Sequence, residues 1–430
     1  MRNSFIKKTV GIIGLGYVGL PLFKLINEKT KFSVLGFDID HLKIKSLKNN
    51  KSYLSDITNK DIKKINKKSL FSGFKKENIS KCDWLIFCLP TPLKNNRPDI
   101  SYIKRALNLV LPHLRYNQTI ILESTVYPGA TKEIFVKKIG KKFEIGKNFF
   151  LCYSPERINP GAKFNKAAKI KFESITKVLS GLTNNCLASI QNLYGKVFSK
   201  IFNAESIEIA EIAKLYENTF RSINISFANE FKILCEKSNI NFHKVIDTCS
   251  TKPFGFKRFN PGPGLGGHCI PIDPMFLDWF AKKNNAPSKF ISLSHKVNTQ
   301  VNNWVLKQIL KNLKKIKQKK RKIIILGVAY KKNINDTRES PSIKIFSNLN
   351  KIKNLKVDYE DKFVLSTKID SKVFKSKKLN YKHLSKYDLV ILMTDHSYYN
   401  SYKILEYSNK IIDCRGLLKN YSSNKKVKFV

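Results

Sequence analysis

The sequence predicts an α/β protein with two Rossmann-like, doubly wound domains that are joined by a long central helix. Three observations support this prediction: a strand, glycine turn, helix, strand and acid near the N-terminus, a long stretch without glycine or proline in the middle, and further apolar strands after residue 320. A chain of 430 residues also exceeds one ordinary core. We expect a first α/β domain at 1–204, a central helical region with a cysteine loop at 205–313, and a second α/β domain at 314–430.

The formal net charge of +48 raises the question of nucleic-acid binding. Eighty lysines and arginines face 32 aspartates and glutamates, yet only ten of the basic residues are arginine, and the lysines are spread along the whole chain. Nucleic-acid sites usually combine arginine with interleaved aromatic residues. We therefore expect no nucleic-acid partner, and we expect the positive charge to help attract a small polyanionic substrate.

The sequence shows no pattern for export or membrane insertion. No run approaches the ~20 apolar residues of a membrane span, and the N-terminus lacks a signal-peptide pattern. The eight cysteines are scattered without a CxxC pair, which is typical of reduced, mostly buried thiols and not of a metal cluster. These patterns predict a cytoplasmic protein without membrane contact or bound metal.

The first strand and turn predict a dinucleotide site. An apolar run at Thr9–Ile13 leads into GLGYVG at Gly14–Gly19, and a helical pattern follows. In such a turn, Gly14 permits the tight bend, Gly16 lets a pyrophosphate approach, and Gly19 allows the helix to pack on the strand. The helix N-terminus then presents N–H groups and its positive dipole end to the phosphates.

The second strand of this pattern, Ser33–Phe37, ends in Asp38. A carboxylate at this position accepts hydrogen bonds from the adenine-ribose hydroxyls, and it repels a 2′-phosphate. The sequence therefore predicts that the cofactor is NAD and not NADP.

Three more apolar strands end in polar motifs. Trp84–Leu89 ends in PTP, Thr119–Leu122 ends in ESTVYPG, and Phe149–Tyr153 runs into SPERINPG. Ligands of open parallel sheets lie beyond the carboxyl ends of the strands. The motifs therefore place four side chains at this predicted rim: Thr91, Thr125, Glu156 and Arg157. The two threonines are equally compatible with ordinary turn-forming hydroxyls.

The stretch Glu205–Ser238 contains no glycine or proline and carries apolar residues at helical spacing. A helix of this length, roughly 50 Å at ~1.5 Å per residue, exceeds the need of one domain. This stretch predicts a helix that connects the two α/β domains and provides a dimer surface. Lys214 and Asn218 are four residues apart and share one face of this helix. The alternative for Lys214 is an ordinary solvated lysine.

The loop Pro261–Pro274 reads PGPGLGGHCIPIDP, with Cys269 after four glycines and Asp273 four residues later. Glycines let such a loop wrap a polar ligand and present the thiol to it. A thiol becomes a strong nucleophile when neighbouring charge favours the thiolate, and His268 or a nearby lysine is a candidate for that role. The alternative is a flexible loop with an ordinary buried cysteine.

The rest of the chain predicts a second α/β domain. Helical patterns cover Met275–Lys283 and His295–Leu313, and a basic linker, Lys314–Lys322, follows them. The predicted strands of the second domain are Lys322–Leu326, Leu389–Met393 and Lys410–Asp413.

In their order, the motifs of this chain resemble those of the UDP-sugar 6-dehydrogenases: GLGYVGLPL, PTP, ESTVYPG, YSPERINPG, AKLYENTF, PGPGLGGHCIPIDP and GVAYKKNINDTRESPS. The resemblance covers nearly the whole chain. YSPERINPG and KPFGFKRFNPGPGLGGHCIPIDP are similar to the branch that oxidises UDP-N-acetylglucosamine or its galacto epimer. The UDP-glucose branch has a second glutamate where this chain has Pro160, so Pro160 receives no ligand role.

The resemblance implies a four-electron oxidation of the C6 alcohol of a UDP-sugar to a carboxylate, with two NAD used in succession. It implies that Cys269 captures the intermediate aldehyde as a thiohemiacetal, which is then oxidised to a thioester. Lys214 and Asn218 are expected to stabilise the developing oxyanions.

The same resemblance assigns the proton transfers. Water held by Asp273, Lys214 and Thr125 is expected to take the proton of the sugar hydroxyl. Glu156 is expected to activate the water that hydrolyses the thioester.

Binding residues are also implied by the resemblance, with NAD in the domain 1–204 and the UDP-sugar in the domain 314–430. The expected cofactor contacts are Gly14, Gly16, Tyr17, Val18, Gly19, Asp38, Lys43, Thr91, Thr125 and Arg338. The expected substrate contacts are Glu156, Arg157, Lys214, Asn218, Arg258, Phe259, Asn260, Pro261, Gly262, Gly266 and Lys331. Family members are dimers through the long helix, so we expect a homodimer.

The expected substrate is UDP-N-acetylglucosamine, and the alternatives are the galacto and manno epimers and UDP-glucose. Pocket discrimination of one hydroxyl orientation depends on a few contacts that the sequence does not reveal. A β-hydroxyacid dehydrogenase shares the cofactor domain and a helical lysine, but it needs neither the Cys269 loop nor residues 322–430. A basic nucleic-acid-binding module is the alternative from a different class.

Overall fold

A computed structural model describes residues 8–54, 56–65, 69–72, 74–158 and 172–430. The chain divides into two compact units. Unit 1 comprises 1–217 and 275–286, and unit 2 comprises 218–274 and 287–430. The predicted positions 159–161, with Pro160 among them, lie outside the described residues.

Unit 1 is a doubly wound α/β unit. In its described residues, the main sheet has eight strands in the order β10-β9-β8-β7-β4-β1-β2-β3, and every neighbouring pair is parallel except β8 with β9. The strands are β1 (Thr9–Ile13), β2 (Ser33–Phe37), β3 (Ser69–Ser72), β4 (Trp84–Phe87), β7 (Thr119–Leu122), β8 (Phe150–Tyr153), β9 (Lys177–Gly181) and β10 (Ile201–Asn203), and a hairpin is formed by β5 (Leu93–Lys94) and β6 (Arg97–Pro98). The strand order reverses between β1 and β4, which is where ligands of such sheets bind.

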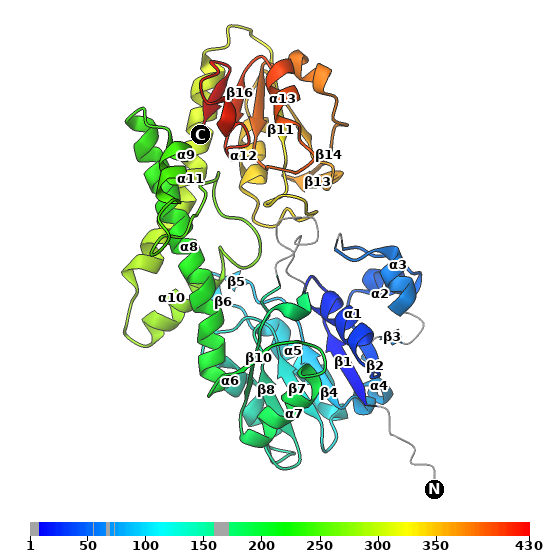
Figure 1. The fold of residues 1–430 in the computed structure, drawn as a ribbon. Coiled ribbons are helices and arrows are strands. Elements are labelled where there is room, and N and C mark those ends of the chain that lie inside the picture. Colours follow the sequence, from blue (N-terminus) through cyan, green and yellow to red (C-terminus); the bar gives the residue numbers. More distant parts are fainter. Residues whose placement is uncertain (1–7, 55, 66–68, 73, 159–171) are drawn as a thin grey trace. The chain divides into compact units, whose positions relative to one another are not determined.

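Helices cover the sheet of unit 1 (Figure 1). They are α1 (Gly19–Lys29), α2 (His41–Lys48), α3 (Asn59–Ile65), α4 (Lys76–Lys81), α5 (Ser101–Val110), α6 (Ala130–Ile139), α7 (Asn184–Tyr194), the first part of α8 (Ile207–Lys237), and α10 (Asp273–Lys283) from Met275 onward. Strands β4 and β7 are buried at every residue, as expected for a parallel sheet with both faces covered. Two apolar clusters form the core, one containing Phe23 of α1 and the other containing Phe135 of α6.

Unit 2 contains a second parallel sheet. Its five described strands have the order β12-β11-β15-β16-β17. They are β11 (Arg321–Leu326), β12 (Leu355–Glu360), β15 (Leu389–Leu392), β16 (Ile411–Asp413) and β17 (Val427–Phe429), and a separate hairpin consists of β13 (Ser366–Ile369) and β14 (Lys372–Lys375). The order reverses between β11 and β15, so this sheet is also doubly wound.

The helices of unit 2 are the second part of α8, α9 (Phe242–Cys249), α11 (Lys289–Lys314), α12 (Pro341–Asn350) and α13 (Ser401–Tyr407). One apolar cluster joins α11 and α12 to the sheet, and a second one lies around α13. In Figure 1, the colours of this sheet run from yellow at β11 to red at the C-terminal strands.

The predicted fold class, with two Rossmann-like sheets and a long helix α8, is confirmed. Strands β1, β2 and β7 have the predicted bounds. Helix α11 begins at Lys289, six residues before the predicted start, because Ser288 caps it by accepting a hydrogen bond from the Ile291 N–H. Among the described residues, no helix is long and apolar enough to cross a membrane.

Candidate functional site

The glycine turn after β1 has the geometry that a dinucleotide requires. Gly14 has a φ of +94°, and a side chain there would meet the Cys88 carbonyl. A Cβ at Gly19 would lie 1.9 Å from the Gly14 carbonyl oxygen, so α1 packs directly on the turn. A Cβ at Gly16 would have no atom within 4 Å, so the missing side chain leaves open space. These residues fit the approach of a pyrophosphate to the backbone between Gly14 and Gly19, the segment that also contains Tyr17 and Val18.

Asp38 stands at the end of β2 beside this turn. Its carboxylate accepts hydrogen bonds from the Leu15 N–H (2.9 Å) and the Asp40 N–H (2.9 Å), and the Lys43 ammonium lies 3.5 Å away. The structure thus brings together the predicted glycine turn, acid and lysine. This arrangement fits an adenine ribose bound at Asp38.

The loops after β4 and β7 are tied to each other. The Leu89 N–H donates to Ser124 Oγ at 2.9 Å, and the same hydroxyl lies 3.4 Å from the Phe87 carbonyl oxygen. Thr91 is buried, and Thr125 is partly exposed at the carboxyl end of β7. Both threonines therefore lie at the predicted rim of the sheet in unit 1.

Glu156 follows β8 and is held from two sides. Its Oε1 accepts hydrogen bonds from the N–H groups of Arg157 (2.6 Å) and Ile158 (2.5 Å), and its Oε2 lies 2.9 Å from Lys177 Nζ. The Arg157 guanidinium is paired with Glu217 of α8. The carboxylate of Glu156 is therefore fixed in orientation by described neighbours on both oxygens.

Sequence reasoning missed the partners of Glu156. Lys177 at the start of β9 also lies 2.8 Å from Glu123 Oε1, and Tyr194 of α7 donates a hydrogen bond to that same oxygen. Burial, aided by the negative charge of Glu156, raises the pKa of Glu123 to about 7 although Lys177 opposes this shift. Glu123 opens the ESTVYPG motif, which is a usable signal. No sequence pattern distinguishes Lys177, because it is one of about seventy lysines along the chain.

Glu211 is a second residue that sequence reasoning missed. It is fully buried in α8, and it accepts hydrogen bonds from the N–H groups of Gly129 (2.5 Å) and Thr131 (2.9 Å) and from Thr131 Oγ1 (2.6 Å). Burial raises the pKa of Glu211 to about 7. A carboxylate at the N-terminus of α6 stabilises that helix. Glu211 thereby fixes α8, three residues before Lys214, against the loop that carries Thr125.

In unit 2, the structure brings Asn218, Asp273 and Cys269 together. Asn218 Nδ2 donates to Asp273 Oδ2 at 2.5 Å, and the Asp273 N–H donates to the Cys269 carbonyl oxygen at 2.8 Å. Six of the eight cysteines are buried, whereas Cys269 is exposed. The alternative of an ordinary buried thiol at Cys269 therefore does not describe this loop.

His268 precedes Cys269, and the structure argues against the suggestion that it supplies positive charge. Burial lowers the pKa of His268, and the nearby Arg338 guanidinium lowers it further. The imidazole is therefore neutral at pH 7 and does not favour a thiolate through its charge.

Three asparagines hold the cysteine loop in place within unit 2. Asn229 Oδ1 accepts from the Gly262 N–H (2.9 Å), and Asn229 Nδ2 donates to Asn298 Oδ1 (3.1 Å). Asn302 Nδ2 donates to the Pro263 carbonyl oxygen at 3.0 Å. A side chain at Gly262 would collide with Arg415, and one at Gly266 would collide with Tyr330. The glycines here permit close packing of the loop on the second sheet.

The remaining predicted ligand residues lie around this loop in unit 2. Arg258 pairs with Asp247 and also donates to Asn260 Oδ1 at 3.0 Å. Phe259 packs in a small apolar cluster with Phe242, and Pro261 is buried. The carbonyl of Arg338 accepts from the Gly267 N–H, while its guanidinium forms a fork on Asp336. Lys331 is half-buried in the segment after β11.

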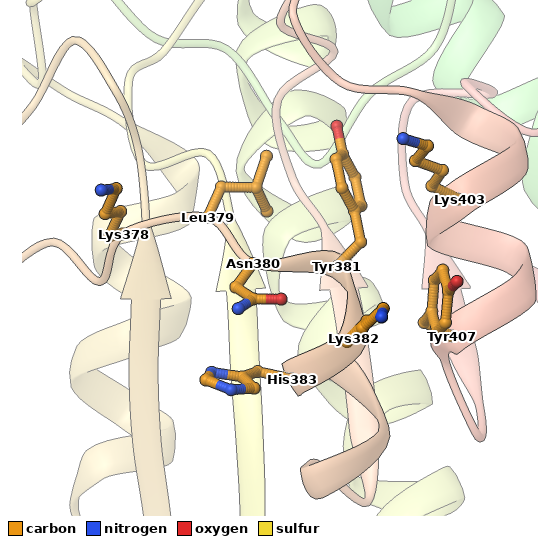
Figure 2. A pocket seen from close by; sticks show the side chains of 8 residues that line it. All are labelled: Lys378, Leu379, Asn380, Tyr381, Lys382, His383, Lys403 and Tyr407. Carbon is orange, nitrogen blue, oxygen red and sulfur yellow. The ribbon is translucent and has the colours of Figure 1, made fainter.

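A hollow of about 550 Å³ lies elsewhere in unit 2. Figure 2 shows its lining, which consists of residues 378–383 with Lys403 and Tyr407. None of the predicted site residues lines it, so it is separate from the candidate site.

Three family models match successive parts of the chain. Residues 8–198 match the NAD binding domain of the UDP-glucose/GDP-mannose dehydrogenase family, residues 208–300 match its central domain, and residues 324–420 match its UDP binding domain.

Curated relatives and solved structures are similar over most of the chain. Protein CapL of Staphylococcus aureus is 34% identical over 95% of this chain and 94% of its own length. The UDP-N-acetyl-D-mannosamine dehydrogenase of Methanococcus vannielii is 33% identical over 98% of this chain and 96% of its own length. The UDP-N-acetyl-D-glucosamine 6-dehydrogenase of Salmonella typhi is 33% identical over 83% of this chain and 82% of its own length. The structure of the UDP-D-ManNAc dehydrogenase of Pyrococcus horikoshii has a TM-score of 0.85 at 26% identity, and the match covers 98% of this chain and 99% of that one.

Proposed function

This chain belongs to the UDP-glucose/GDP-mannose dehydrogenase family of NAD-dependent oxidoreductases, and we propose that it oxidises C6 of a UDP-N-acetylhexosamine through a thioester on Cys269. The observation that carries the proposal is the exposed thiol of Cys269 on a turn that closes onto Asp273, whose carboxylate is bonded to Asn218. A single oxidation of an alcohol requires no nucleophile. An exposed thiol in such a setting supports covalent capture of an aldehyde.

When bound, NAD would supply the hydride acceptor for each of the two oxidations. The glycine turn and Asp38 would hold it, with Lys43, Thr91, Thr125 and Arg338 as further contacts. The acid Asp38 excludes a 2′-phosphate because the two negative charges repel each other.

The residues of the chain supply the proton transfers and charge stabilisation. Water held by Asp273, Lys214 and Thr125 takes the proton of the C6 hydroxyl. Asn218 uses one N–H on Asp273, which orients its amide for donation to an oxyanion. The ammonium of Lys214, one helical turn earlier, is the second donor. Each such donor contributes about 3 kcal/mol in the transition state.

Glu156 orients the water that releases the product. The carboxylate is buried and fixed by its described neighbours, so its remaining lone-pair direction is defined. Substrate phosphates and uridine bind through Arg157 and through the loop 258–262 with Gly266 and Lys331.

The first candidate substrate is UDP-N-acetylglucosamine, because YSPERINPG and the cysteine loop resemble the branch that oxidises it. UDP-N-acetylmannosamine is the second candidate, because the relative named for that sugar matches over a larger share of the chain than the one named for the glucosamine enzyme. Both candidates share the mechanism and differ in the orientation of one N-acetyl group.

The test is NADH formation by purified protein with four sugars offered separately: UDP-N-acetylglucosamine, UDP-N-acetylgalactosamine, UDP-N-acetylmannosamine and UDP-glucose. Two NADH per sugar consumed, with an N-acetyl sugar preferred, is the expected result. A preference for UDP-glucose would overturn the assignment of the branch, and one NADH per sugar would overturn the four-electron reaction.

The variant Cys269→Ser separates the covalent route from a non-covalent one. It is expected to stop at the aldehyde level, with the second NADH lost, because serine does not form a reactive thioester. Cys249→Ser is the matched control, since Cys249 is the other exposed thiol. Carboxylate formation by Cys269→Ser at the normal rate would remove the thioester step.

We also propose a homodimer through α8. The helix exposes large apolar side chains along its length: Ile209, Tyr216, Phe220, Phe227 and Leu234. Sedimentation equilibrium is expected to give a dimer, and Phe227→Glu is expected to weaken it by at least about tenfold, because it places a charge in an apolar interface.

A further inference from the structure

A buried cluster in unit 1 contains Glu156 together with three side chains that the proposed mechanism does not use: Glu123, Lys177 and Tyr194. The ammonium of Lys177 lies between the carboxylates, 2.8 Å from Glu123 Oε1 and 2.9 Å from Glu156 Oε2. Lys177 is 3% exposed. Its Nζ also lies 5.2 Å from the ring centroid of Tyr194 and 5.3 Å from that of Phe198. We refer to the four residues as the buried cluster.

The charge of Lys177 is maintained by its neighbours. Burial lowers the pKa of its ammonium, but the two carboxylates outweigh burial and raise it well above the ordinary value. An unpaired charge in such a place is strongly destabilising, whereas a paired one is tolerated. Lys177 is therefore a permanent cation between Glu123 and Glu156.

The two carboxylates differ in the donors that reach them. Glu156 Oε1 accepts two backbone N–H groups, and its Oε2 accepts from Lys177. Glu123 Oε1 accepts from Lys177 and Tyr194, but its Oε2 is buried without a hydrogen-bond partner among the described residues. Hydrogen bonds from donors stabilise the anionic form of a carboxylate. Described donors therefore hold both oxygens of Glu156 but only Oε1 of Glu123.

The lone pairs of Glu156 show which oxygen remains available. A carboxylate has about four lone-pair sites. The described donors occupy both sites of Oε1 and one site of Oε2. The remaining site is on Oε2, the oxygen that Lys177 holds.

We propose that Lys177 is a positioning residue for hydrolysis, because its ammonium fixes Glu156 Oε2, the oxygen with the remaining lone pair, for proton transfer from the water that attacks the thioester. This inference rests on the proposed function of Glu156. The water oxygen bonds to the thioester carbonyl carbon, and the C–S bond breaks with its electron pair on Cys269 Sγ. One water proton passes to Glu156 Oε2 and then to the thiolate, and the other is released when the new carboxylic acid ionises. Lys177 exchanges no proton in this step.

The test follows single turnovers of Lys177→Gln by rapid mixing with NAD and the UDP-sugar that the four-sugar assay identifies. We expect a burst of two NADH per subunit at the wild-type rate. The steady-state rate that follows is expected to be at least about tenfold lower than that of the wild type, because hydrolysis is the step in which Glu156 acts as the general base. Intact-protein mass spectrometry is expected to show the sugar attached to Cys269. Lys200→Gln is the matched control, since Lys200 is exposed on the neighbouring segment and its carbonyl accepts from the Lys177 N–H.

A purely structural role for Lys177 would give a different result. It would slow the burst and the steady state together, and that outcome would overturn the proposal, as would a steady state equal to that of Lys200→Gln. The covalent adduct on Cys269, measured by mass spectrometry, is a second readout, because a purely structural defect would not increase the fraction of enzyme that carries it.

Lys177→Arg covers the case in which Lys177→Gln does not fold. It keeps the charge but changes the donor geometry, so hydrolysis is expected to slow while the burst does not, and an unchanged ratio of the two rates would overturn the proposal. Glu156→Gln separates the two levels of the argument. If Glu156→Gln accumulates the adduct and neither variant of Lys177 does, the positioning role alone is wrong. If the wild type turns over and Glu156→Gln accumulates no adduct, the proposed role of Glu156 is wrong.

Discussion

The two parallel sheets contain the same turn with different surroundings. After β1, Gly14 has a φ of +94°, its N–H donates to the Phe37 carbonyl, and Asp38 accepts from the next N–H. After β11, Gly327 has a φ of +86°, its N–H donates to the Glu360 carbonyl, and Asp361 accepts from the next two N–H groups. In both cases an acid at the end of the second strand fixes a glycine turn at the end of the first.

The space beside each turn differs. In unit 1, a Cβ at Gly16 would meet no atom within 4 Å, and α1 begins five residues after Gly14. In unit 2, the position that corresponds to Gly16 is Ala329, which is fully buried, and α12 begins fourteen residues after Gly327. A Cβ at Gly327 itself would lie 2.4 Å from Thr394 Cβ, just as one at Gly14 would lie 2.4 Å from the Cys88 carbonyl oxygen.

The acids beside the two turns, Asp38 and Asp361, also differ in their exposure and in their neighbouring side chains. Asp361 is fully buried and lies 3.1 Å from His396 Nε2. Asp38 keeps a small exposed fraction, and Lys43 is its neighbouring cation. The glycine turn with its acid is therefore a structural feature that both sheets share. The turn becomes a dinucleotide site only where side chains leave the space beside it open.

The largest expected effect is on stability at the filled turn. Gly327→Ala is expected to lower the free energy of unfolding by about 4 kcal/mol, because it combines a strained positive φ with a collision against Thr394. Urea unfolding followed by circular dichroism measures this loss. Gly255→Ala is the matched control in unit 2, because Gly255 also has a positive φ (+66°) but open space around it. Equal losses for the two variants would show that Thr394 does not fill the turn.

The second prediction concerns Glu360, which flanks the filled turn. Burial raises its pKa from the ordinary 4.5 to about 7, although the hydroxyls of Tyr399 and Tyr398 oppose the shift. The folded chain therefore holds a proton that the unfolded chain releases above pH 4.5. The contribution of Glu360 to stability is complete below that pH and is lost as the pH rises toward 7.

Because of this shift in pKa, the free energy of unfolding is expected to fall by about 3 kcal/mol as the pH rises from 4.5 to 7. Glu360→Gln is expected to remove that part of the pH dependence, as measured by urea unfolding across this range. Glu406→Gln is the control, because Glu406 is not buried and lies on α13 of the same unit. An unchanged profile for Glu360→Gln would contradict the shift.

The third prediction tests the open turn. Gly16→Val places a side chain in the space that we assign to the pyrophosphate, so the Kd for NAD is expected to rise about 100-fold, or about 2.7 kcal/mol. The thermal unfolding midpoint is expected to stay unchanged, because the new Cβ meets no protein atom. Isothermal titration calorimetry measures the affinity, with UDP binding as the internal control. Wild-type affinity for NAD would place the cofactor elsewhere.

The strands and the cofactor turn could be predicted from the sequence because their signals are local. A buried parallel strand such as β7 is a short apolar run, and GLGYVG determines the turn that follows β1. The hairpin of β13 and β14 was missed, because its turn uses Asp370 and Ser371 at positive φ in place of the usual asparagine and glycine.

The buried cluster could not be predicted for a different reason. Its members are far apart in the sequence, and the burial of Lys177 depends on two carboxylates that other strands supply. The same limit applies to Glu211, whose partners at Gly129 and Thr131 lie about eighty residues away. Pairings of this kind are set by tertiary packing, for which the sequence has no local pattern.

The smallest expected effect is on the preference for NAD over NADP, and it distinguishes the role of Asp38 from that of Asp361. Asp38→Asn removes the charge that repels a 2′-phosphate and leaves Lys43 to attract it, so the preference for NAD over NADP is expected to fall about tenfold, or about 1.4 kcal/mol. The ratio of kcat/KM values for the two cofactors measures this preference. Asp361→Asn, which makes the same change at the filled turn, is expected to leave the ratio unchanged and to lower stability, because its new amide N–H groups face backbone donors. If Asp361→Asn shifted the cofactor preference and Asp38→Asn did not, the turn of unit 2 would be the dinucleotide site and the comparison between the two turns would be reversed.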